Sequence, residues 1–563
     1  MTASNTPARM VGAGLVTGPL GYLVAQVPLD HAGTVGWTTV ATATALTAGG
    51  GYAWTAGRRA TTSHINRWSR RARRNHGVQS LAGHLKTTSS VAMRRRAKTL
   101  RPSLADLSRV QRLRLPVTEY ATPLGKSGAR TLYVSHEDVV LRVAGARSGK
   151  TTALACRIVD HPGPVVVTST RVDLLHWTGP MRAKRGPLHV FNPAGVGGIA
   201  STLKWSPLVG CKSIETAMRR ADDLIPASAS DEREGWNDQA RRVLAPLLFA
   251  AARGDRTMAH VLGWASASGE QAKKAERQIL LLLDDAPEAA AMRENVKQFF
   301  GMTGENEKTR SSIVTTLMPA LQWLSNPTAA AIGDAPVSDD MLDVNELLAT
   351  NGTVYLLGGT NRVTGALTGA LVAEIAFRAS QRAEGMPGGR LDPALLLALD
   401  EAALVAPGPL DRWTSDMGGR GVVLDIAVQS LAWLHGVWGE NGARIILGNA
   451  AVVLLGAGCK DPEDIAHWEA LSGTREETAE TRDADGKVTS TSTRRVPVLG
   501  RDQIAALPKF HAVVYGAGPI TIIRTPNIWK RRDARRAMAR AGEQVRETRY
   551  AEKLAAAGEK VTA

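Results

Sequence analysis

The chain has 563 residues, which is enough for roughly two to four domains and a sizeable hydrophobic core. Its formal net charge of +17 favours an anionic partner, either nucleic acid or a membrane surface. The three cysteines, Cys156, Cys211 and Cys459, are far apart and form no C-x-x-C pair. This spacing argues against a zinc site or a disulfide scaffold and indicates a reducing cytosol.

Two apolar segments stand at the N-terminus. Residues 10–28 and 35–57 contain no Asp, Glu, Lys or Arg, and each is about the ~20 residues that a spanning helix needs. They predict a two-helix transmembrane hairpin, so residues 1–57 form an N-terminal membrane anchor. Both segments are rich in Ala, Thr and Gly, and a pair of apolar soluble helices is the alternative.

A strongly basic stretch follows, from 58 to 115. Between Arg58 and Arg114 there are 16 Lys and Arg residues and one acid, Asp106. By the positive-inside rule this flank stays cytoplasmic, which predicts a two-pass protein of the inner or plasma membrane with both termini in the cytoplasm. The stretch is a cytoplasmic linker that touches anionic lipid head groups, DNA or both, or is only solvated.

A strand, a Gly-rich loop and a helix are expected next, in the order that a phosphate-binding loop requires. Residues 139–143 are an apolar run, and helix-like spacing begins at Lys150. Lys150 is expected to reach the β- and γ-phosphates of ATP, and the Thr151 hydroxyl to ligate Mg²⁺. The motif usually begins with glycine, where this chain has Ala144, and an ordinary Gly-rich turn is the alternative. The expected nucleotide-binding residues are Ala144, Gly145, Ala146, Arg147, Ser148, Gly149, Lys150, Thr151 and Thr152.

Two acids follow the apolar run 395–399. Asp400 and Glu401 are predicted at the carboxyl end of a parallel strand, where ligands bind in α/β sheets. Asp400 is expected to hold Mg²⁺ through water, and Glu401 to orient and deprotonate the attacking water. Together with the Gly-rich loop, this pair predicts a nucleotide hydrolase that uses ATP and Mg²⁺.

The remaining pattern predicts an α/β fold with a RecA-like P-loop NTPase domain. Strands are expected at 164–170, 188–191, 353–357, 422–428 and 451–455, with a closing hairpin at 513–515 and 520–523. From 213 to 336 the periodicity is helical, which predicts an inserted all-α domain between 116–212 and 337–527. Residues 478–495 indicate an exposed hairpin or a flexible loop. The tail 528–563 is basic and helical, and is either a second anionic contact or a solvated helix.

An ordered set of short segments runs from about 139 to 526. The loop Ala-Gly-Ala-Arg-Ser-Gly-Lys-Thr at 144–151 is followed by 201–208, the acid pair at 400–401, 419–421, 428–431, 448–449, 472–473 and 495–504. In order and approximate spacing these segments resemble the type IV coupling proteins, the TraG/TraD-type ATPases of conjugation systems. One stretch departs from the resemblance: many relatives carry an Asp-Pro-Lys-Gly-like segment where this chain has Thr-Ser-Thr-Arg-Val-Asp at 168–173.

The resemblance implies a membrane-anchored homo-hexamer with nucleotide at its subunit interfaces. It implies that Gln429, at the end of a strand, senses the γ-phosphate, and that Arg420 acts across the interface as an arginine finger. A buried, satisfied amide and a surface arginine are the alternatives for these two residues.

The leading interpretation is a DNA-translocating coupling ATPase. It would receive a relaxase bound to single-stranded DNA and deliver this complex to a type IV secretion channel, gripping phosphates without sequence preference. The alternatives are an FtsK/HerA-like pump for double-stranded DNA, and a nucleotide-regulated receptor for secreted proteins.

Overall fold

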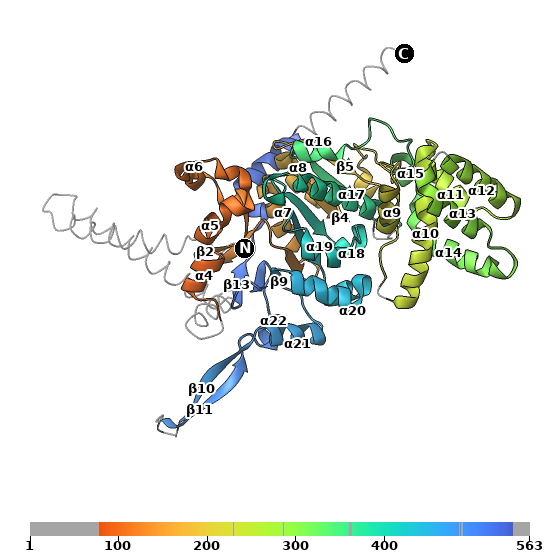
Figure 1. The fold of residues 1–563 in the computed structure, drawn as a ribbon. Coiled ribbons are helices and arrows are strands. Elements are labelled where there is room, and N and C mark those ends of the chain that lie inside the picture. The colour runs from red at the N-terminus through yellow and green to blue at the C-terminus, as the bar shows by residue number, and fades with distance from the viewer. Residues whose placement is uncertain are drawn as a thin grey trace, which may run out of the picture. The chain divides into compact units, whose positions relative to one another are not determined.

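The main feature of the computed structural model is an eleven-stranded sheet in the order β2-β1-β13-β12-β9-β3-β8-β7-β4-β6-β5 (Figure 1). The structure describes residues 78–543 apart from 229, 285, 360–362, 483–484 and 486–487. The strands of the sheet are β1 (Ala121–Ser127), β2 (Arg130–Ser135), β3 (Val140–Val143), β4 (Val165–Ser169), β5 (Leu188–Phe191), β6 (Thr353–Leu357), β7 (Leu395–Asp400), β8 (Val422–Val428), β9 (Val452–Gly456), β12 (His511–Tyr515) and β13 (Thr521–Arg524).

The strands from β9 to β5 run parallel to their neighbours, and β12, β13, β1 and β2 add an antiparallel extension. Strands β3, β4, β6, β7, β8 and β9 are buried at every position. Parallel strands that are covered on both faces carry such near-continuous apolar runs, because neither face meets water. The predicted α/β fold class with a large parallel sheet is confirmed.

Helices connect the parallel strands and contribute to the core. A buried cluster joins Leu154 and Ile158 of α7 to Val167 of β4 and Leu396 of β7. The same cluster contains Ala534, which lies in a helix over 532–543, so the start of the C-terminal tail packs on the core. The connecting helices are α7 (Lys150–Asp160), α8 (Asp173–Arg182), α16 (Val344–Ala349), α17 (Gly365–Glu384), α18 (Ala402–Val405), α19 (Leu410–Asp416), α20 (Leu431–Asn449), α21 (Pro462–Leu471) and α22 (Arg501–Ala505).

Between 213 and 336 the described residues form helices and no strand. The long helix α10 contacts α9, α11, α12, α13 and α14, so it is the centre of this helical segment. The helices are α9 (Ile214–Leu224), α10 (Asp231–Arg253), α11 (Met258–Ser266), α12 (Gly269–Asp284), α13 (Ala290–Phe300), α14 (Glu307–Leu321) and α15 (Pro327–Gly333). The predicted domain boundaries stay a prediction.

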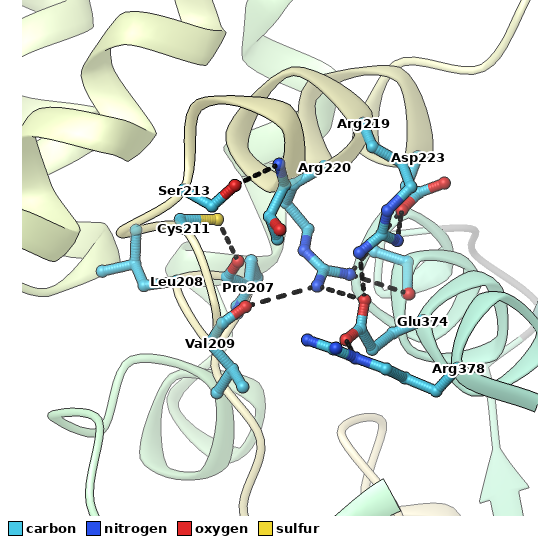
Figure 2. A network of polar contacts seen from close by, with 12 residues as sticks. Pro207, Leu208, Val209, Cys211, Ser213, Arg219, Arg220, Asp223, Glu374 and Arg378 are labelled. Carbon is cyan, nitrogen blue, oxygen red and sulfur yellow. Dashed lines mark hydrogen bonds and ion pairs between the residues drawn. The ribbon is translucent and has the colours of Figure 1, made fainter. Parts of the chain in front are cut away.

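A buried cluster of charges ties this helical segment to the sheet domain (Figure 2). The carboxylate of Glu374, on α17, accepts hydrogen bonds from Arg219 at 2.5 Å and from Arg220 at 2.8 Å, both on α9. It also accepts one from Arg378, one helical turn further along α17, at 2.9 Å. Burial opposes the ionisation of Glu374, but the surrounding arginines outweigh it and lower the pKa of this carboxyl to about 2. Glu374 is therefore a buried anion that needs all of these partners.

The second half of the basic stretch is folded. Three helices, α4 (Leu81–Thr87), α5 (Ser90–Leu100) and α6 (Arg109–Arg114), lie beside the β1–β2 hairpin, and Met93, Leu100 and Leu104 form a buried cluster there with Tyr120. The sequence predicts a basic linker at 58–115 and no particular helix or strand between 81 and 135, because this region has no long apolar run.

The two segments predicted to cross a membrane, 10–28 and 35–57, lie outside the described residues. Within the part of the chain that the structure does describe, no helix combines the length and the apolar character needed to span a bilayer.

The segment around 478–495 forms a separate two-stranded antiparallel sheet, β10 (Thr474–Arg482) with β11 (Val488–Pro497) (Figure 1). Short 3₁₀ turns complete the fold: η1 (Pro102–Ala105), η2 (Val117–Glu119), η3 (Val196–Gly198), η4 (Pro287–Ala289), η5 (Gly304–Asn306), η6 (Gln322–Ser325), η7 (Pro387–Gly389) and η8 (Ile528–Lys530).

Candidate nucleotide-binding site

Four neighbouring strands bring the predicted nucleotide motifs to one edge of the sheet. Val143, the last residue of β3, is in register with Val428, the last residue of β8. Strand β8 pairs with β7, which in turn pairs with β4, where Thr168 is in register with Leu399, the residue before Asp400. Because the carboxyl ends of parallel strands meet at the same edge, the residues that follow these strands are neighbours. Strand β8 separates the strand of the Gly-rich loop from the strand of the two acids.

The Gly-rich loop turns tightly into α7. Arg147 and Gly149 both have left-handed backbone conformations, with φ of 59° and 101°, and α7 begins directly afterwards at Lys150. A Cβ atom on Gly149 would lie 2.5 Å from the ring of Phe510, so both the conformation and the space require glycine here. The Phe510 N–H donates to the Ser148 carbonyl at 3.1 Å, and this hydrogen bond ties the loop to the segment before β12.

Ala144 fits in the place of the motif's first glycine because the opposing residues are glycines. It is buried, and its N–H donates to the Val428 carbonyl at 3.2 Å. A Cβ atom on Gly456 would lie only 2.7 Å from the Ala144 methyl group, and one on Gly145 would lie 2.9 Å from the Gly458 carbonyl oxygen. The extra methyl group of Ala144 is therefore accommodated by glycine at the end of β9.

The first residues of α7 meet the two acids. Lys150 Nζ donates to the Ala144 carbonyl at 3.2 Å, and Thr151 Oγ1 donates to Asp400 Oδ2 at 3.0 Å. Burial lowers the pKa of Lys150, whereas the charges of Asp400 and Glu401 oppose this change. The predicted phosphate-binding lysine and the predicted acids thus act on one another electrostatically, although 249 positions separate Thr151 from Asp400.

The residues present fit a magnesium nucleotide. Asp400 is buried, and its Oδ1 has no hydrogen-bond partner among the described residues. Burial raises the pKa of the Asp400 carboxyl to about 6, although the Lys150 charge opposes the rise. An unpaired carboxylate oxygen beside the Thr151 hydroxyl is the type of hard oxygen ligand that Mg²⁺ prefers.

Glu401 stands directly after β7 in a left-handed conformation, with φ of 53° and ψ of 45°. Such a conformation costs a non-glycine residue on the order of 1–3 kcal/mol and is found mainly at functional sites. Gln429 Nε2 donates to Glu401 Oε1 at 3.4 Å. The structure therefore brings together the predicted general base and the predicted γ-phosphate sensor.

Thr170 is a site residue that the sequence analysis did not assign. Its hydroxyl donates to Glu401 Oε2 at 2.5 Å, and the hydroxyl of Thr168 donates to the Asp400 carbonyl at 3.0 Å. Both threonines belong to the 168–173 stretch that departs from the family pattern. That departure was the one sequence feature that could have pointed to these residues. In the structure the two hydroxyl groups donate hydrogen bonds to Asp400 and Glu401.

The other predicted loop residues are less involved in contacts. Ala146 and Arg147 are exposed, whereas Ser148 is buried. Thr152 Oγ1 donates to the Gly149 carbonyl at 2.7 Å, which supports the turn into α7.

Arg420 is not part of this cluster within one chain. Its side chain lies on the surface, where it donates to Glu384 Oε1 at 2.8 Å and to Asp416 Oδ2 at 2.9 Å. These hydrogen bonds and charges raise the pKa of the Arg420 guanidinium, so it is a firmly charged cation. Its predicted role across a subunit interface stays a prediction.

Part of the chain matches one protein family, and most of it aligns with solved structures. Residues 394–509 match the family model described as the TraM recognition site of TraD and TraG. No curated protein matches the sequence. Among solved structures, the bacterial conjugative coupling protein TrwBdeltaN70 in its unbound form aligns with 78% of this chain and 92% of its own, at 17% identity and a TM-score of 0.56.

Two further TrwB structures align with 69% of this chain and 85% of their own. TrwB in complex with ADP and Mg²⁺ has 18% identity and a TM-score of 0.51, and TrwB in complex with the GTP analogue GDPNP has 17% identity and a TM-score of 0.51. At this identity the likeness shows a shared fold. Through the matched family segment at 394–509 and the shared fold over most of the chain, the resemblance to the TraG/TraD-type coupling proteins is confirmed.

Proposed function

We propose that this chain is a membrane-anchored, ATP-driven DNA translocase, the coupling protein of a conjugation system. The observation that carries the proposal is the meeting of Lys150, Thr151, Asp400 and Glu401 at one edge of the parallel sheet, on a TraG/TraD-type fold. A Gly-rich loop, a lysine, a hydroxyl and two acids are the parts that a P-loop ATPase needs.

Each residue has a distinct task in this proposal. Bound ATP with Mg²⁺ would supply the phosphoryl group whose transfer to water releases free energy. Lys150 and the loop N–H groups hold the phosphate charges, and Thr151 with Asp400 holds the cation. Glu401 orients the attacking water and accepts its proton.

Two further residues act around this centre. Gln429 contacts Glu401, so a change at the γ-phosphate would be passed to the base through this hydrogen bond. Arg420 would leave its pairs with Glu384 and Asp416 to stabilise the transition state in a neighbouring subunit. A trans arginine contributes on the order of 10³-fold or more to the rate, which would couple hydrolysis to assembly of a homo-hexamer.

The cargo is proposed to be a relaxase bound to single-stranded DNA, which is delivered to a type IV secretion channel. The net charge of +17 favours an anionic partner such as DNA, and the matched family segment is described as the TraM recognition site of TraD and TraG. In the proposed arrangement residues 1–57 cross the inner or plasma membrane twice, and the ATPase domain stays in the cytoplasm.

ATP hydrolysis by the full chain, with and without single- or double-stranded DNA, tests this proposal. Lys150→Ala and Glu401→Gln are the inactive controls. We expect stimulation by single strands that both variants abolish. A preference for duplex would favour an FtsK/HerA-like pump, and controlled turnover that ignores DNA would favour a receptor for secreted proteins.

A further inference from the structure

Helices α4, α5 and α6 carry aliphatic side chains on faces that the protein core does not cover. The inner face of α5 packs into a buried cluster through Met93 and Leu100. Outward-facing leucines and valines of the three helices are nevertheless 47–59% exposed. They are Leu81, Leu85, Val91, Val110 and Leu113. These residues, with the cations that lie among them, are called the α4–α6 surface below.

The α4–α6 surface is also strongly basic. Its exposed cations form no ion pair with any residue that the structure describes, and Asp106 is the one acid between 81 and 114. These cations are Lys86, Arg95, Lys98, Arg109 and Arg114. Two arginines of the same region behave differently, because Arg96 pairs with Glu137 and Arg101 with Asp392. The α4–α6 surface thus has an excess of positive charge that no described acidic residue neutralises.

Cations and aliphatic groups share the same helix faces. On α5, Val91, Arg95 and Lys98 are spaced four and three residues apart, which places them along one side of the helix. On α6, Arg109 and Leu113 are four residues apart, as are Val110 and Arg114, so each pair lies along one side of the helix. The Leu113 carbonyl accepts a hydrogen bond from Arg94 of α5 at 2.6 Å. Helices α4 and α5 are also in contact, so the three helices adjoin one another in the order α4, α5, α6. Figure 1 shows them in the same part of the fold.

We propose that the α4–α6 surface binds the anionic head groups of a lipid bilayer. Nucleic acid phosphates would use the cations but leave the exposed Leu and Val side chains in water. A bilayer interface binds both kinds of side chain, because the aliphatic groups enter the boundary of the acyl chains while Lys and Arg reach the head groups. Only residues 58–80 separate the surface from the second predicted membrane span, so the membrane anchor of the proposed function, on which this step rests, would tether the surface near a bilayer. The proposal does not depend on nucleotide hydrolysis.

Site-specific fluorescence on the full chain tests this proposal. An environment-sensitive dye is attached at Leu85→Cys or Leu113→Cys in a Cys459→Ala background, since Cys156 and Cys211 are buried. Leu281→Cys on α12, which is 74% exposed, is the matched control. The protein is mixed with vesicles of phosphatidylcholine, alone or with phosphatidylglycerol, that carry a head-group nitroxide quencher.

We expect the lipid quencher to remove the fluorescence at positions 85 and 113 in the anionic vesicles, and to leave position 281 unaffected. This loss of fluorescence should become smaller as the salt concentration rises from roughly 0.1 M to 1 M, because the Debye length falls from about 10 Å to about 3 Å. The variant R95Q/K98Q/R109Q/R114Q loses the quenching. The control K273Q/K297Q, which removes two exposed cations of the helical segment, keeps it.

Other outcomes would overturn the proposal, and each would identify a different occupant. Equal quenching in neutral and anionic vesicles would mean that head-group charge is not recognised. A quencher dissolved in the buffer serves as a second probe of the dye. If the dye were protected from this soluble quencher but not quenched by the lipid nitroxide, protein would cover the surface, either residues 1–77 or a second copy of the chain. Shielding that appears only when single-stranded DNA is added would assign the surface to nucleic acid.

Discussion

At the scale of single residues, the candidate site depends on hydroxyl groups that no nucleotide motif contains. Thr170 donates to the carboxylate of Glu401, and Thr168 donates to the backbone of Asp400. Glu401 follows β7 in a left-handed backbone conformation, and its carboxylate also accepts a hydrogen bond from Gln429 at 3.4 Å. Thr168 in β4 and Thr170 directly after it therefore help to fix the position of the proposed base.

Thr170→Val tests this role, because valine keeps the shape of threonine and removes the hydroxyl. We expect kcat for ATP hydrolysis to fall by about tenfold to a hundredfold, since a hydrogen bond to a charged group contributes on the order of 1.5–3 kcal/mol. KM should change little, because Thr170 has no predicted contact with the nucleotide.

Thr170→Ser is the matched control and should restore most of the rate, because serine keeps the hydroxyl. Steady-state kinetics of both variants give the answer. Equal losses in the valine and serine variants would mean that the threonine methyl group matters rather than the hydrogen bond.

A second prediction at this scale concerns pH. Burial raises the pKa of Asp400 to about 6, so below that pH the neutral carboxylic acid predominates and a proton competes with the metal. We expect the Mg²⁺-dependent gain in ADP affinity to fall by up to about tenfold per pH unit below 6, as one proton is displaced. Calorimetry with and without Mg²⁺ measures this gain.

Asp400→Asn separates this effect from the titration of ADP itself. The variant should gain little affinity from Mg²⁺ at any pH. If wild type and variant showed the same pH profile between 5 and 7.5, Asp400 would not be the titrating ligand.

At the scale of elements, α9 is held to α17 by charges rather than by apolar packing alone. Glu374 is buried among Arg219, Arg220 and Arg378 (Figure 2). The same arginines also lie over aromatic rings: Arg219 is 3.9 Å from the ring centroid of Phe377, and Arg220 is 4.8 Å from that of Trp205. The helical segment is thus connected to the sheet domain through a contact that is built around one buried anion.

Glu374→Gln is expected to destabilise the protein by about 3 kcal/mol, because it leaves buried arginines without their anion. Glu294→Gln, which alters an exposed pair with Lys297, is the control and should have little effect. Denaturant unfolding measures both. A loss in Glu374→Gln no larger than in the control would show that the cluster contributes no net stability.

The loss of stability in Glu374→Gln should depend on pH in a defined direction. The pKa of Glu374 is lowered from 4.5 to about 2 in the folded protein, so its ionised form stabilises the fold above pH 4.5. This contribution decreases as the pH falls toward 2. The difference between wild type and Glu374→Gln should therefore shrink over that interval, and a constant difference would contradict the assignment.

At the scale of the whole molecule, the position of Arg420 away from the acid cluster agrees with a site shared between subunits. Within one chain it contacts Glu384 and Asp416. If it acts across an interface, a subunit with an intact Glu401 needs Arg420 only from its neighbour.

Mixing two inactive proteins tests this arrangement. Arg420→Ala and Glu401→Gln should each hydrolyse ATP poorly, whereas an equimolar mixture should recover part of the wild-type rate through interfaces that combine one intact residue from each. A mixture no more active than its components, although mixed rings form, would exclude a trans role.

The sequence by itself indicated which residues form the candidate site and where most strands of the parallel sheet lie. Buried parallel strands are short apolar runs, and the Gly-rich loop and the acid pair follow such runs directly, so they are visible as local patterns. The order of these motifs along the chain was also enough to indicate the family.

Only the tertiary structure decided which residues support those motifs. Thr170 and Glu401 are 231 positions apart, and Phe510 stands behind a loop that ends more than 350 positions earlier, at Lys150. A phenylalanine carries no local signal of such a role, and the departure at 168–173 marked the stretch that contains Thr170 without indicating which acid its hydroxyl contacts. The importance of both residues comes from strand order and register, which bring distant parts of the chain to one edge of the sheet and are not encoded in any short segment.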